Sequence, residues 1–254
     1  MSRTVGIIPA RYGSTRLPGK PLVSILGQPM IFWVWDQARR AKNLDRVIVA
    51  TDDNRVKKAV EKFGGEAVIT SPKHTSGSDR VAEVARSLTC DIVVNIQGDE
   101  PLISPSSLDR LVDSLSSEKD VNMATLVTPI QNRAKISDLN VVKAVFDKDN
   151  NALYFSRFLQ PYTNSSGSKG DYISGLSSYY AHIGVYAYRK SFLLKFTGWK
   201  PGNLEKLEKL EQLRVLENGY PIKIVKTVDN THHVDRAEDI KEVEKILRKR
   251  NEGR

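Results

Sequence analysis

Short, almost uninterrupted apolar segments alternate with helical patterns through the first 120 residues, and this alternation is the strongest constraint on the fold. Segments such as Arg46–Ala50 and Ile92–Ile96 are typical of strands buried on both faces of a parallel sheet. The expected strands are Val5–Ile8, Arg46–Ala50, Ala67–Thr70 and Ile92–Ile96, and the expected helices are Met30–Arg40, Val56–Phe63, Arg80–Leu88 and Ser107–Leu115. The sequence therefore predicts an α/β protein with a Rossmann-like mixed, mostly parallel sheet flanked by helices.

The alternation stops near residue 120, and a second pattern follows it. Four strand-like segments come next with no long helix between the first three, which is typical of antiparallel or mixed pairing: Met123–Ile130, Val141–Phe146, Leu153–Phe155 and His182–Tyr188. Residues 161–178, rich in Ser, Gly, Tyr and Asn, are predicted to be a mobile surface loop. The later elements expected are one amphipathic helix with a core-packing row of leucines at Leu204–Leu216, a strand at Ile222–Val228 and a closing helix at Ala237–Arg250. No linker is visible, so residues 1–254 are expected to form a single domain in which 120–200 is a smaller, inserted antiparallel subregion.

The charge composition restricts the class of partner only weakly. The chain has 39 Lys and Arg against 30 Asp and Glu, a formal net charge of +9. These residues are spread along the chain, and the only dense basic run is 248–250. Basicity of this kind fits an anionic small substrate as well as it fits a nucleic acid. A basic nucleic-acid-binding protein is therefore kept as the non-enzyme alternative.

The single cysteine, Cys90, excludes an internal disulfide framework and any cysteine-based zinc site, and it is typical of a reducing compartment. Because Cys90 precedes an apolar strand, we expect a buried structural thiol and not a nucleophile. No apolar stretch approaches the length of a membrane span, and the N-terminus has no signal-peptide segment of useful length. We therefore expect a soluble, cytoplasmic protein without a membrane partner.

The loop after the first expected strand, residues 9–20 (PARYGSTRLPGK), has the composition of a phosphate-binding loop. Arg11, Arg16 and Lys20 supply positive charge, while Ser14 and the backbone amides supply hydrogen-bond donors. Loops that follow parallel strands open on the sheet edge where α/β proteins bind ligands. The pattern GxxxxGK[ST] does not fit, because a proline follows the lysine. The alternative is a basic surface loop with ordinary turn glycines.

Two aspartates follow strand-like segments on the same expected edge. Asp99 and Asp235 would repel a triphosphate unless a divalent cation intervened, and carboxylate oxygens suit Mg²⁺. Taken alone, Asp99 fits a polar loop residue equally well, and Asp235, with Glu238 three residues on, favours a helix cap. The pair His232–His233 resembles a metal site, but with four histidines in the chain zinc is not expected. The residues alone predict metal-assisted nucleotidyl or phosphoryl transfer.

Several longer motifs resemble the 3-deoxy-manno-octulosonate cytidylyltransferase (CMP-Kdo synthetase) family. In chain order they are IIPARYGSTRLPGKPL, VATDD, HTSGSDR, VNIQGDEPLI, ALYFSR, HIGVYAYR and LEKLEQLRVLENG, and they extend over almost the whole chain. The opening loop fits sugar nucleotidyltransferases broadly, whereas its combination with QGDEP, YFSR and LEQLR is more specific. The resemblance implies a fold of the nucleotide-diphospho-sugar transferase type. It also implies a reaction in which CTP and a 3-deoxy-octulosonic sugar acid (Kdo) give CMP-Kdo and pyrophosphate for lipopolysaccharide synthesis.

The resemblance also implies roles for individual residues. The catalytic residues would be Arg11, Lys20, Asp99 and Asp235, with Asp99 and Asp235 as the ligands of Mg²⁺. CTP would be bound by Pro9, Ala10, Arg11, Ser14, Arg16, Lys20, Ser76, Gly77 and Arg80. The sugar acid would be bound by Gln97, Arg157, His182, Tyr186, Glu211 and Gln212. No general base stands out, and a metal ion close to the attacking sugar hydroxyl would make one unnecessary.

The chain departs from the family pattern mainly near the expected sugar side. Ser78 and Asp79 stand where Thr and Glu are common, Ala181 where a basic residue is frequent, and bulky His233 where smaller residues are usual. CTP is therefore a firmer expectation than the sugar. The 8-amino-3,8-dideoxy analogue of Kdo, or another 2-keto sugar acid such as a sialic acid, stays open as the acceptor. The resemblance also predicts a homodimer formed through 120–200.

Overall fold

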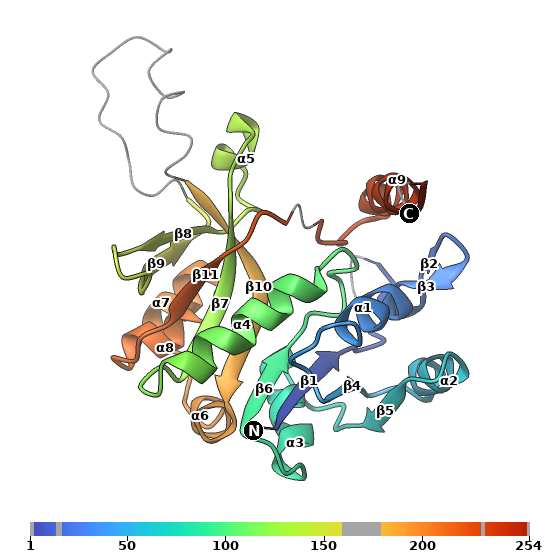
Figure 1. Cartoon of the computed structure of the whole chain (residues 1–254), viewed down its shortest axis with the longest axis horizontal. Coiled ribbons are helices and arrows are strands. Elements are labelled where there is room, and N and C mark those ends of the chain that lie inside the picture. Colours follow the sequence, from blue (N-terminus) through green and yellow to red (C-terminus); the bar gives the residue numbers. More distant parts are fainter. Residues whose placement is uncertain (1–2, 14–16, 159–178, 230–231, 253–254) are drawn as a thin grey trace.

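The computed structural model describes residues 3–13, 17–158, 179–229 and 232–252, and a large mixed sheet forms its centre (Figure 1). Nine of the described strands lie in this sheet in the order β11-β7-β10-β6-β1-β4-β5, with β8 beside β10 and β9 beside β8. Their bounds are β1 (Thr4–Pro9), β4 (Arg46–Thr51), β5 (Glu66–Ile69), β6 (Ile92–Asn95), β7 (Met123–Pro129), β8 (Lys143–Phe146), β9 (Ala152–Ser156), β10 (Tyr180–Arg189) and β11 (Lys223–Lys226). A separate small hairpin is made by β2 (Ser24–Ile25) and β3 (Gln28–Pro29).

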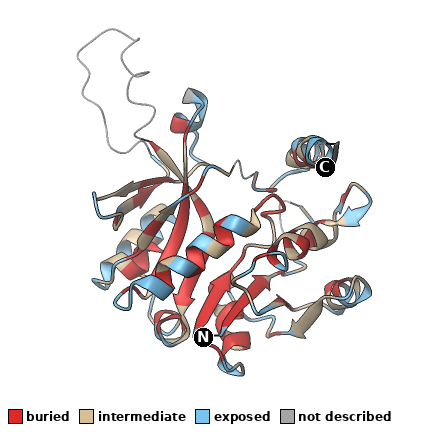
Figure 2. Cartoon of the chain, in the orientation of Figure 1, coloured by how far each residue is buried: buried red, intermediate tan, exposed pale blue. Residues whose placement is uncertain are grey.

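The parallel part of the sheet is the part predicted from the first 120 residues. β1 pairs in parallel with β4 on one side and with β6 on the other, and β5 pairs in parallel with β4. In β1, Ile7 and Ile8 are fully buried in hydrophobic clusters on opposite faces of the sheet. Because both faces are covered, strands of this kind are apolar at almost every position. Figure 2 shows this burial across the centre of the sheet.

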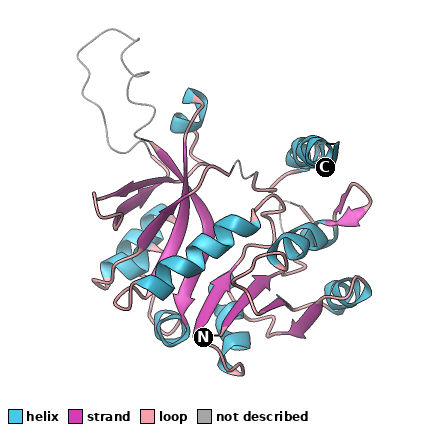
Figure 3. Ribbon diagram, viewed as in Figure 1, coloured by secondary structure: helices cyan, strands magenta, loops and turns pink. Residues whose placement is uncertain are grey.

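Helices pack on both faces of the sheet (Figure 3). Their bounds are α1 (Met30–Ala38), α2 (Asn54–Lys62), α3 (Gly77–Arg86), α4 (Pro105–Ser117), α5 (Arg133–Ser137), α6 (Lys190–Phe196), α7 (Asn203–Glu208), α8 (Leu213–Glu217) and α9 (Ala237–Glu252), with a short 3-10 helix, η1 (Lys20–Leu22). One hydrophobic cluster joins the sheet to α1, α2 and α4, and the other joins it to α3, α6 and α8. The predicted layers are therefore present.

β10 is the strand at which the sheet changes direction. It runs antiparallel to its neighbours β6 and β7 and to β8, which in turn pairs antiparallel with β9. β11 then adds a parallel strand beside β7. The strands after residue 120 are mixed, as expected, and they continue the main sheet. The predicted loop 161–178 lies outside the described residues.

The single amphipathic helix predicted at Leu204–Leu216 is wrong. The segment forms α7 and α8, separated at Lys209, whose φ of 55° is left-handed and ends the first helix. Leu213 is buried as expected, but Leu207 is 80% exposed. The break lets polar groups turn inward: the Glu208 carboxylate accepts hydrogen bonds from the Ser156 hydroxyl and the Arg157 backbone N–H at 2.8 and 3.1 Å.

Two simpler expectations concern the thiol and the membrane. Cys90 is buried, and burial raises the pKa of its thiol, as expected of a structural cysteine. None of the described helices combines the length and the apolar character needed to cross a membrane.

Candidate functional site

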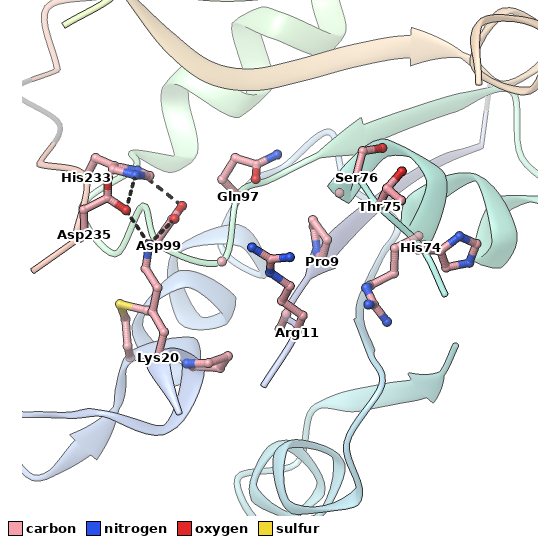
Figure 4. A pocket seen from close by; sticks show the side chains of 16 residues that line it. Pro9, Arg11, Lys20, His74, Thr75, Ser76, Gln97, Asp99, His233 and Asp235 are labelled. Carbon is pink, nitrogen blue, oxygen red and sulfur yellow. Dashed lines mark hydrogen bonds and ion pairs between the residues drawn. The ribbon is translucent and has the colours of Figure 1, made fainter. Parts of the chain in front are cut away.

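A cleft of about 360 Å³ lies where β1 and β6 end and where α3 and η1 begin. Figure 4 shows its two ends: one carries the charged side chains of Lys20, Asp99, His233 and Asp235, and the other the polar side chains of His74, Thr75 and Ser76. The other lining residues are Pro9, Ala10, Arg11, Pro21, Met30, Gly77, Arg80, Gln97 and Gly98. The cleft therefore opens at the sheet edge where the sequence placed the phosphate loop.

Lys20 joins the two aspartates that the sequence singled out. Its ammonium lies 2.5 Å from Asp99 Oδ2 and 3.0 Å from Asp235 Oδ1. Gly19 precedes it with a left-handed φ of 65°, which lets the chain turn directly into η1. A cation thus already sits between two carboxylates from distant parts of the chain.

His233 completes this charged end. Its Nδ1 lies 3.3 Å from Asp99 Oδ1 and 3.5 Å from Glu100 Oε1, and its Nε2 lies 3.2 Å from Asp235 Oδ1. Although loss of water around the ring opposes it, the negative charge of Asp99 and hydrogen bonds to these carboxylates raise the pKa of His233 to about 12.

The same contacts shift the pKa values of the neighbouring carboxylates. The hydrogen bond from His233 is the main cause that holds the pKa of Asp235 well below its usual range, and Lys20 adds to it. For Asp99, burial works in the opposite direction, but the charges of His233 and Lys20 outweigh it and the pKa is lowered. Burial dominates at Glu100, so its pKa is raised. Asp99 and Asp235 are therefore ionised acceptors at neutral pH.

The backbone holds this end together. The Val234 N–H donates to the Asp99 carbonyl at 3.0 Å, which fixes the segment before α9 against the turn after β6. Val234 itself is fully buried, so its neighbours His233 and Asp235 project to the opposite side, toward the carboxylates and Lys20. In the first turn of α9, the Asp239 carboxylate accepts the Asp235 and Arg236 N–H groups at 2.8 and 2.7 Å and fixes the backbone that leads into the helix.

The other end of the cleft is built on the start of α3. Ser76 caps the helix by accepting the Asp79 N–H at 3.1 Å. Arg80, 3% exposed, donates to the Thr70 hydroxyl at 2.5 Å and to Asp52 Oδ2 at 2.9 Å. The other oxygen of Asp52 accepts the Tyr12 N–H at 3.1 Å, so one carboxylate ties the loop after β1 to α3.

Two glycines leave room in this cleft. A Cβ on Gly77 would lie 3.3 Å from the Pro9 side chain, and a Cβ on Gly98 would lie 2.9 Å from the Pro9 carbonyl oxygen. Glycine therefore lets the turn after β6 pass close to the end of β1. The backbone can approach a ligand from both strands.

The residues expected at the sugar acid lie in a second, more buried group beside the cleft. The Tyr186 hydroxyl donates to Gln212 Oε1 at 3.3 Å, and the His182 ring lies 5.4 Å from the Tyr186 ring. Burial lowers the pKa of His182 to about 3 and raises that of Tyr186 above its usual range. The Arg157 guanidinium donates instead to two backbone carbonyls, those of Glu208 and Leu139.

A chain of polar contacts joins this second group to the cleft. Gln97 donates to Asn95 at 3.0 Å, Asn95 donates to Ser78 at 3.4 Å, and Ser78 donates to Glu211 Oε2 at 2.5 Å. Burial raises the pKa of Glu211. The outer carboxylate oxygen, Glu211 Oε1, and Gln212 Nε2 are buried without a hydrogen-bond partner in the described structure. These two atoms are available to a polar ligand.

The structure thus brings most of the predicted residues together. The cleft contains Pro9, Ala10, Arg11, Lys20, Ser76, Gly77, Arg80, Gln97, Asp99 and Asp235. Ser14 and Arg16 lie outside the described residues. The sequence reasoning did not place His74, Thr75, Gly98, Met30 or Pro21 here, and it set His233 aside as a metal ligand. His74 and Thr75 lie in the family motif HTSGSDR, Gly98 lies in VNIQGDEPLI, and His233 lies two residues before Asp235, so each of these carried a signal in the sequence.

The chain is similar to cytidylyltransferases over almost its whole length. Residues 5–240 match the family model described as Cytidylyltransferase. The chain is 49% identical to the 3-deoxy-manno-octulosonate cytidylyltransferase of Syntrophobacter fumaroxidans, over 96% of this chain and 97% of that protein. It is 44% identical to the protein of the same name from Fusobacterium nucleatum, over 97% and 98%.

A solved structure gives the same result for the fold. CMP:2-keto-3-deoxy-manno-octonic acid synthetase complexed with CTP superposes with a TM-score of 0.89 at 37% identity, over 98% of this chain and 100% of that one. The predicted fold class, including its nucleotide-diphospho-sugar transferase type, is confirmed.

Proposed function

This chain belongs to the 3-deoxy-manno-octulosonate cytidylyltransferase family, and we propose that its cleft holds CTP and a divalent cation between Asp99 and the start of α3. The enzyme activates Kdo with CTP, giving CMP-Kdo and pyrophosphate. Family membership removes the nucleic-acid-binding alternative. The geometry of the cleft supports a separate role in this reaction for each group of residues.

The position of Lys20 between Asp99 and Asp235 is the observation that most strongly supports a metal site. An ammonium 2.5 and 3.0 Å from two carboxylate oxygens occupies a position suited to a cation. Asp99 Oδ1 is buried and faces His233 Nδ1 at 3.3 Å, and a carboxylate oxygen has a second lone pair that can bind a cation. Two carboxylates fit Mg²⁺, which prefers a few protein oxygens together with water and phosphate oxygens. When bound, Mg²⁺ would offset the charge of the triphosphate and lower the pKa of the attacking sugar hydroxyl.

Lys20 and Arg11 are proposed to bind the triphosphate. If the two aspartates held a divalent cation, the Lys20 ammonium would be free to pair with the phosphate oxygens instead. Ser76 and Gly77, at the start of α3, line the same cleft, so the positive end of this helix dipole lies beside it. Ser14 and Arg16 stay predicted phosphate ligands.

Cytosine is proposed to lie at the α3 end, between Pro9 and the turn at Ser76 and Gly77. A Cβ on Gly77 would lie 3.3 Å from the Pro9 side chain, so glycine leaves space beside Pro9 in this part of the cleft. Arg80 is held in place by Thr70 and Asp52 and forms the wall of this site.

The sugar acid is proposed to enter between Gln97 and the buried group around Tyr186. Glu211 Oε1, which has no hydrogen-bond partner and lies 4.0 Å from Arg214 Nη2, and Gln212 Nε2 supply an acceptor and a donor for its hydroxyls. Arg157 would have to leave its two backbone carbonyls to pair with the sugar carboxylate. An 8-ammonium group is the other candidate substituent, because the raised pKa of Glu211 would return toward normal beside a cation.

A pyrophosphate-release assay tests these assignments. Turnover should require a divalent cation, prefer CTP over ATP, and fall by at least about 100-fold in Asp99→Asn and Asp235→Asn. Asp149→Asn, an exposed loop substitution, is the matched control and should leave the rate unchanged. Running Kdo and its 8-amino analogue side by side identifies the acceptor. Undiminished turnover in Asp99→Asn would show that the metal assignment is wrong.

Residues 120–200 are proposed to form the dimer interface as a subregion of the single domain. Three large apolar side chains there are more than half exposed: Leu139 at 52%, Leu153 at 59% and Phe158 at 62%. Sedimentation velocity should give a dimer, and Phe158→Glu together with Leu153→Glu should give a monomer. A monomeric wild-type protein would overturn this assignment.

A further inference from the structure

His233 lies among carboxylates on two sides of its ring. Nε2 faces Asp235 Oδ1 at 3.2 Å, while Nδ1 faces Asp99 Oδ1 at 3.3 Å and Glu100 Oε1 at 3.5 Å. The side chain is 46% exposed, so the core does not force the ring into this position. In metal centres an imidazole commonly binds the metal through one nitrogen and donates its other ring N–H to a carboxylate.

The ligand atoms of Asp99, His233 and Asp235 converge. One atom from each lies within 4.8 Å of the others. This spacing fits three ligands around one first-row cation, whose bonds to nitrogen and oxygen are about 2 Å long. The Lys20 ammonium forms ion pairs with both aspartates, so this group of residues already surrounds one positive charge.

We propose that His233 is a third protein ligand of the cation held by Asp99 and Asp235, and that this site favours Mn²⁺ and Co²⁺ over Mg²⁺ more strongly than two aspartates alone would. The inference rests on the proposed metal site and goes beyond it in ligand number and metal preference. Imidazole nitrogen suits the later first-row metals, whereas Mg²⁺ prefers oxygen.

Glu100 acts as a positioning residue for this ligand. It is 5% exposed, and its Oε1 faces the Nδ1 side of the ring. A metal-bound histidine usually donates its other ring N–H to a carboxylate, which fixes the orientation of the ring. Nε2 is then the nitrogen directed to the metal. A metal bound here would take the place of one ring proton and of the Lys20 ammonium.

The backbone explains why His233 can reach the aspartates. The Val234 N–H bond to the Asp99 carbonyl, at 3.0 Å, holds the two segments side by side. With Val234 fully buried on the other side, His233 and Asp235 project together toward Asp99. His232, the neighbouring histidine that makes none of these contacts with the aspartates, serves as the matched control.

Mn²⁺ binding tests the proposal without turnover. The probe is Mn²⁺ added to the full chain, alone and with CTP, with the sugar acid left out. Loss of the free Mn²⁺ EPR signal gives the affinity, and pulsed EPR of bound Mn²⁺ reports nitrogen hyperfine coupling from a directly bound imidazole. Competition with Mg²⁺ gives the metal preference.

In the wild type and in His232→Asn we expect nitrogen coupling, and in His233→Asn we expect none. His233→Asn should weaken Mn²⁺ binding by about 10-fold or more and Mg²⁺ binding by less than about 3-fold. Glu100→Gln, with an intact ring ligand, should keep the coupling but weaken Mn²⁺ binding by roughly 10-fold. Circular dichroism and thermal melting show whether each variant is folded.

Two other results would overturn the proposal in different ways. If wild-type protein binds Mn²⁺ without nitrogen coupling while Asp99→Asn binds it more weakly, the two-aspartate site stands and His233 is not a ligand. If Asp99→Asn binds Mn²⁺ as tightly as the wild type, the proposed metal site itself is wrong.

Discussion

Asp52 should be a main determinant of stability in this fold, although it lies outside every predicted site. Its carboxylate accepts from the Arg80 guanidinium at 2.9 Å and from the Tyr12 N–H at 3.1 Å. The Arg80 side chain is 3% exposed and Asp52 is 17% exposed. Removing one partner of such a pair leaves a buried charge without compensation, which costs about 3–5 kcal/mol.

Asp52→Asn is the informative substitution, because asparagine keeps the shape and can still accept the Tyr12 N–H. Arg80 also keeps its hydrogen bond to the Thr70 hydroxyl. We therefore expect the low end of that range, about 3 kcal/mol. In a chain of this length that corresponds to a Tm lower by roughly 6 to 12 °C. The KM for CTP should rise as well, because the loop after β1 and the wall of the base site lose their shared anchor.

Asp53→Asn is the matched control one residue away. Asp53 caps α2 by accepting the Arg55 N–H at 2.8 Å and pairs with the Arg55 side chain, which is 61% exposed. Asparagine caps helices equally well and exposed ion pairs contribute little, so Tm should change by no more than about 2 °C.

Thermal and urea unfolding of the two variants, and of each combined with Arg80→Met, measure the coupling. The double variant of Asp52 and Arg80 should be less destabilised than the sum of its single variants, because no charge is then left buried alone. Equal Tm losses in Asp52→Asn and Asp53→Asn, or additivity of the cycle within about 0.5 kcal/mol, would refute the reasoning.

Three further outcomes are expected from the structure. Burial lowers the pKa of His182 from 6.5 to about 3, so below pH 6.5 the unfolded chain gains a proton there that the folded chain does not. The free energy of unfolding should therefore fall as the pH decreases from 6.5 toward 3. In urea titrations His182→Gln should make this pH dependence shallower, and an unchanged pH dependence would contradict the reasoning. Gly98→Ala places a Cβ 2.9 Å from the Pro9 carbonyl oxygen and should lower both Tm and CTP affinity. In the control Gly13→Ala, the new Cβ meets no atom within 4 Å, so Tm should stay unchanged. Similar Tm losses in the two variants would refute the packing argument. Lys20→Met removes the ammonium that would compete with the proposed metal, so Mn²⁺ affinity without CTP should rise while turnover falls. If Mn²⁺ affinity and turnover both fell, Lys20 would instead help to hold the metal.

The parallel half of the sheet could be predicted because burial on both faces makes its strands apolar at nearly every position, as Ile7 and Ile8 show. The segment Leu204–Leu216 was predicted wrongly for an equally physical reason. Its leucines keep helical spacing across Lys209, where a non-glycine residue adopts a left-handed φ that the local sequence does not signal. Partly buried hydrogen bonds made by Glu208 and Glu211 favour the break, and these depend on partners far away in the chain.

The site residues also include some that the sequence could place and one that it could not. Lys20 and Asp99 each follow a buried strand, and because the carboxyl ends of parallel strands lie at one edge of the sheet, the sequence predicted that the two residues meet there. Asp235 belongs to a segment that reaches this edge only through the Val234 bond to the Asp99 carbonyl, and a local pattern of acids cannot distinguish it from the capping Asp239.

The charges of this cluster are compatible with the proposal that one site holds both a metal and the triphosphate. Without a metal, two positive groups, Lys20 and His233, face two carboxylates, Asp99 and Asp235. A divalent cation carries the same charge as the ammonium and the ring proton that it replaces, so the carboxylates stay compensated when it binds. Lys20 would then keep its charge and lie beside the place proposed for the triphosphate. The cluster would therefore supply a phosphate-binding cation only after the metal has bound, which couples the two ligands of the reaction.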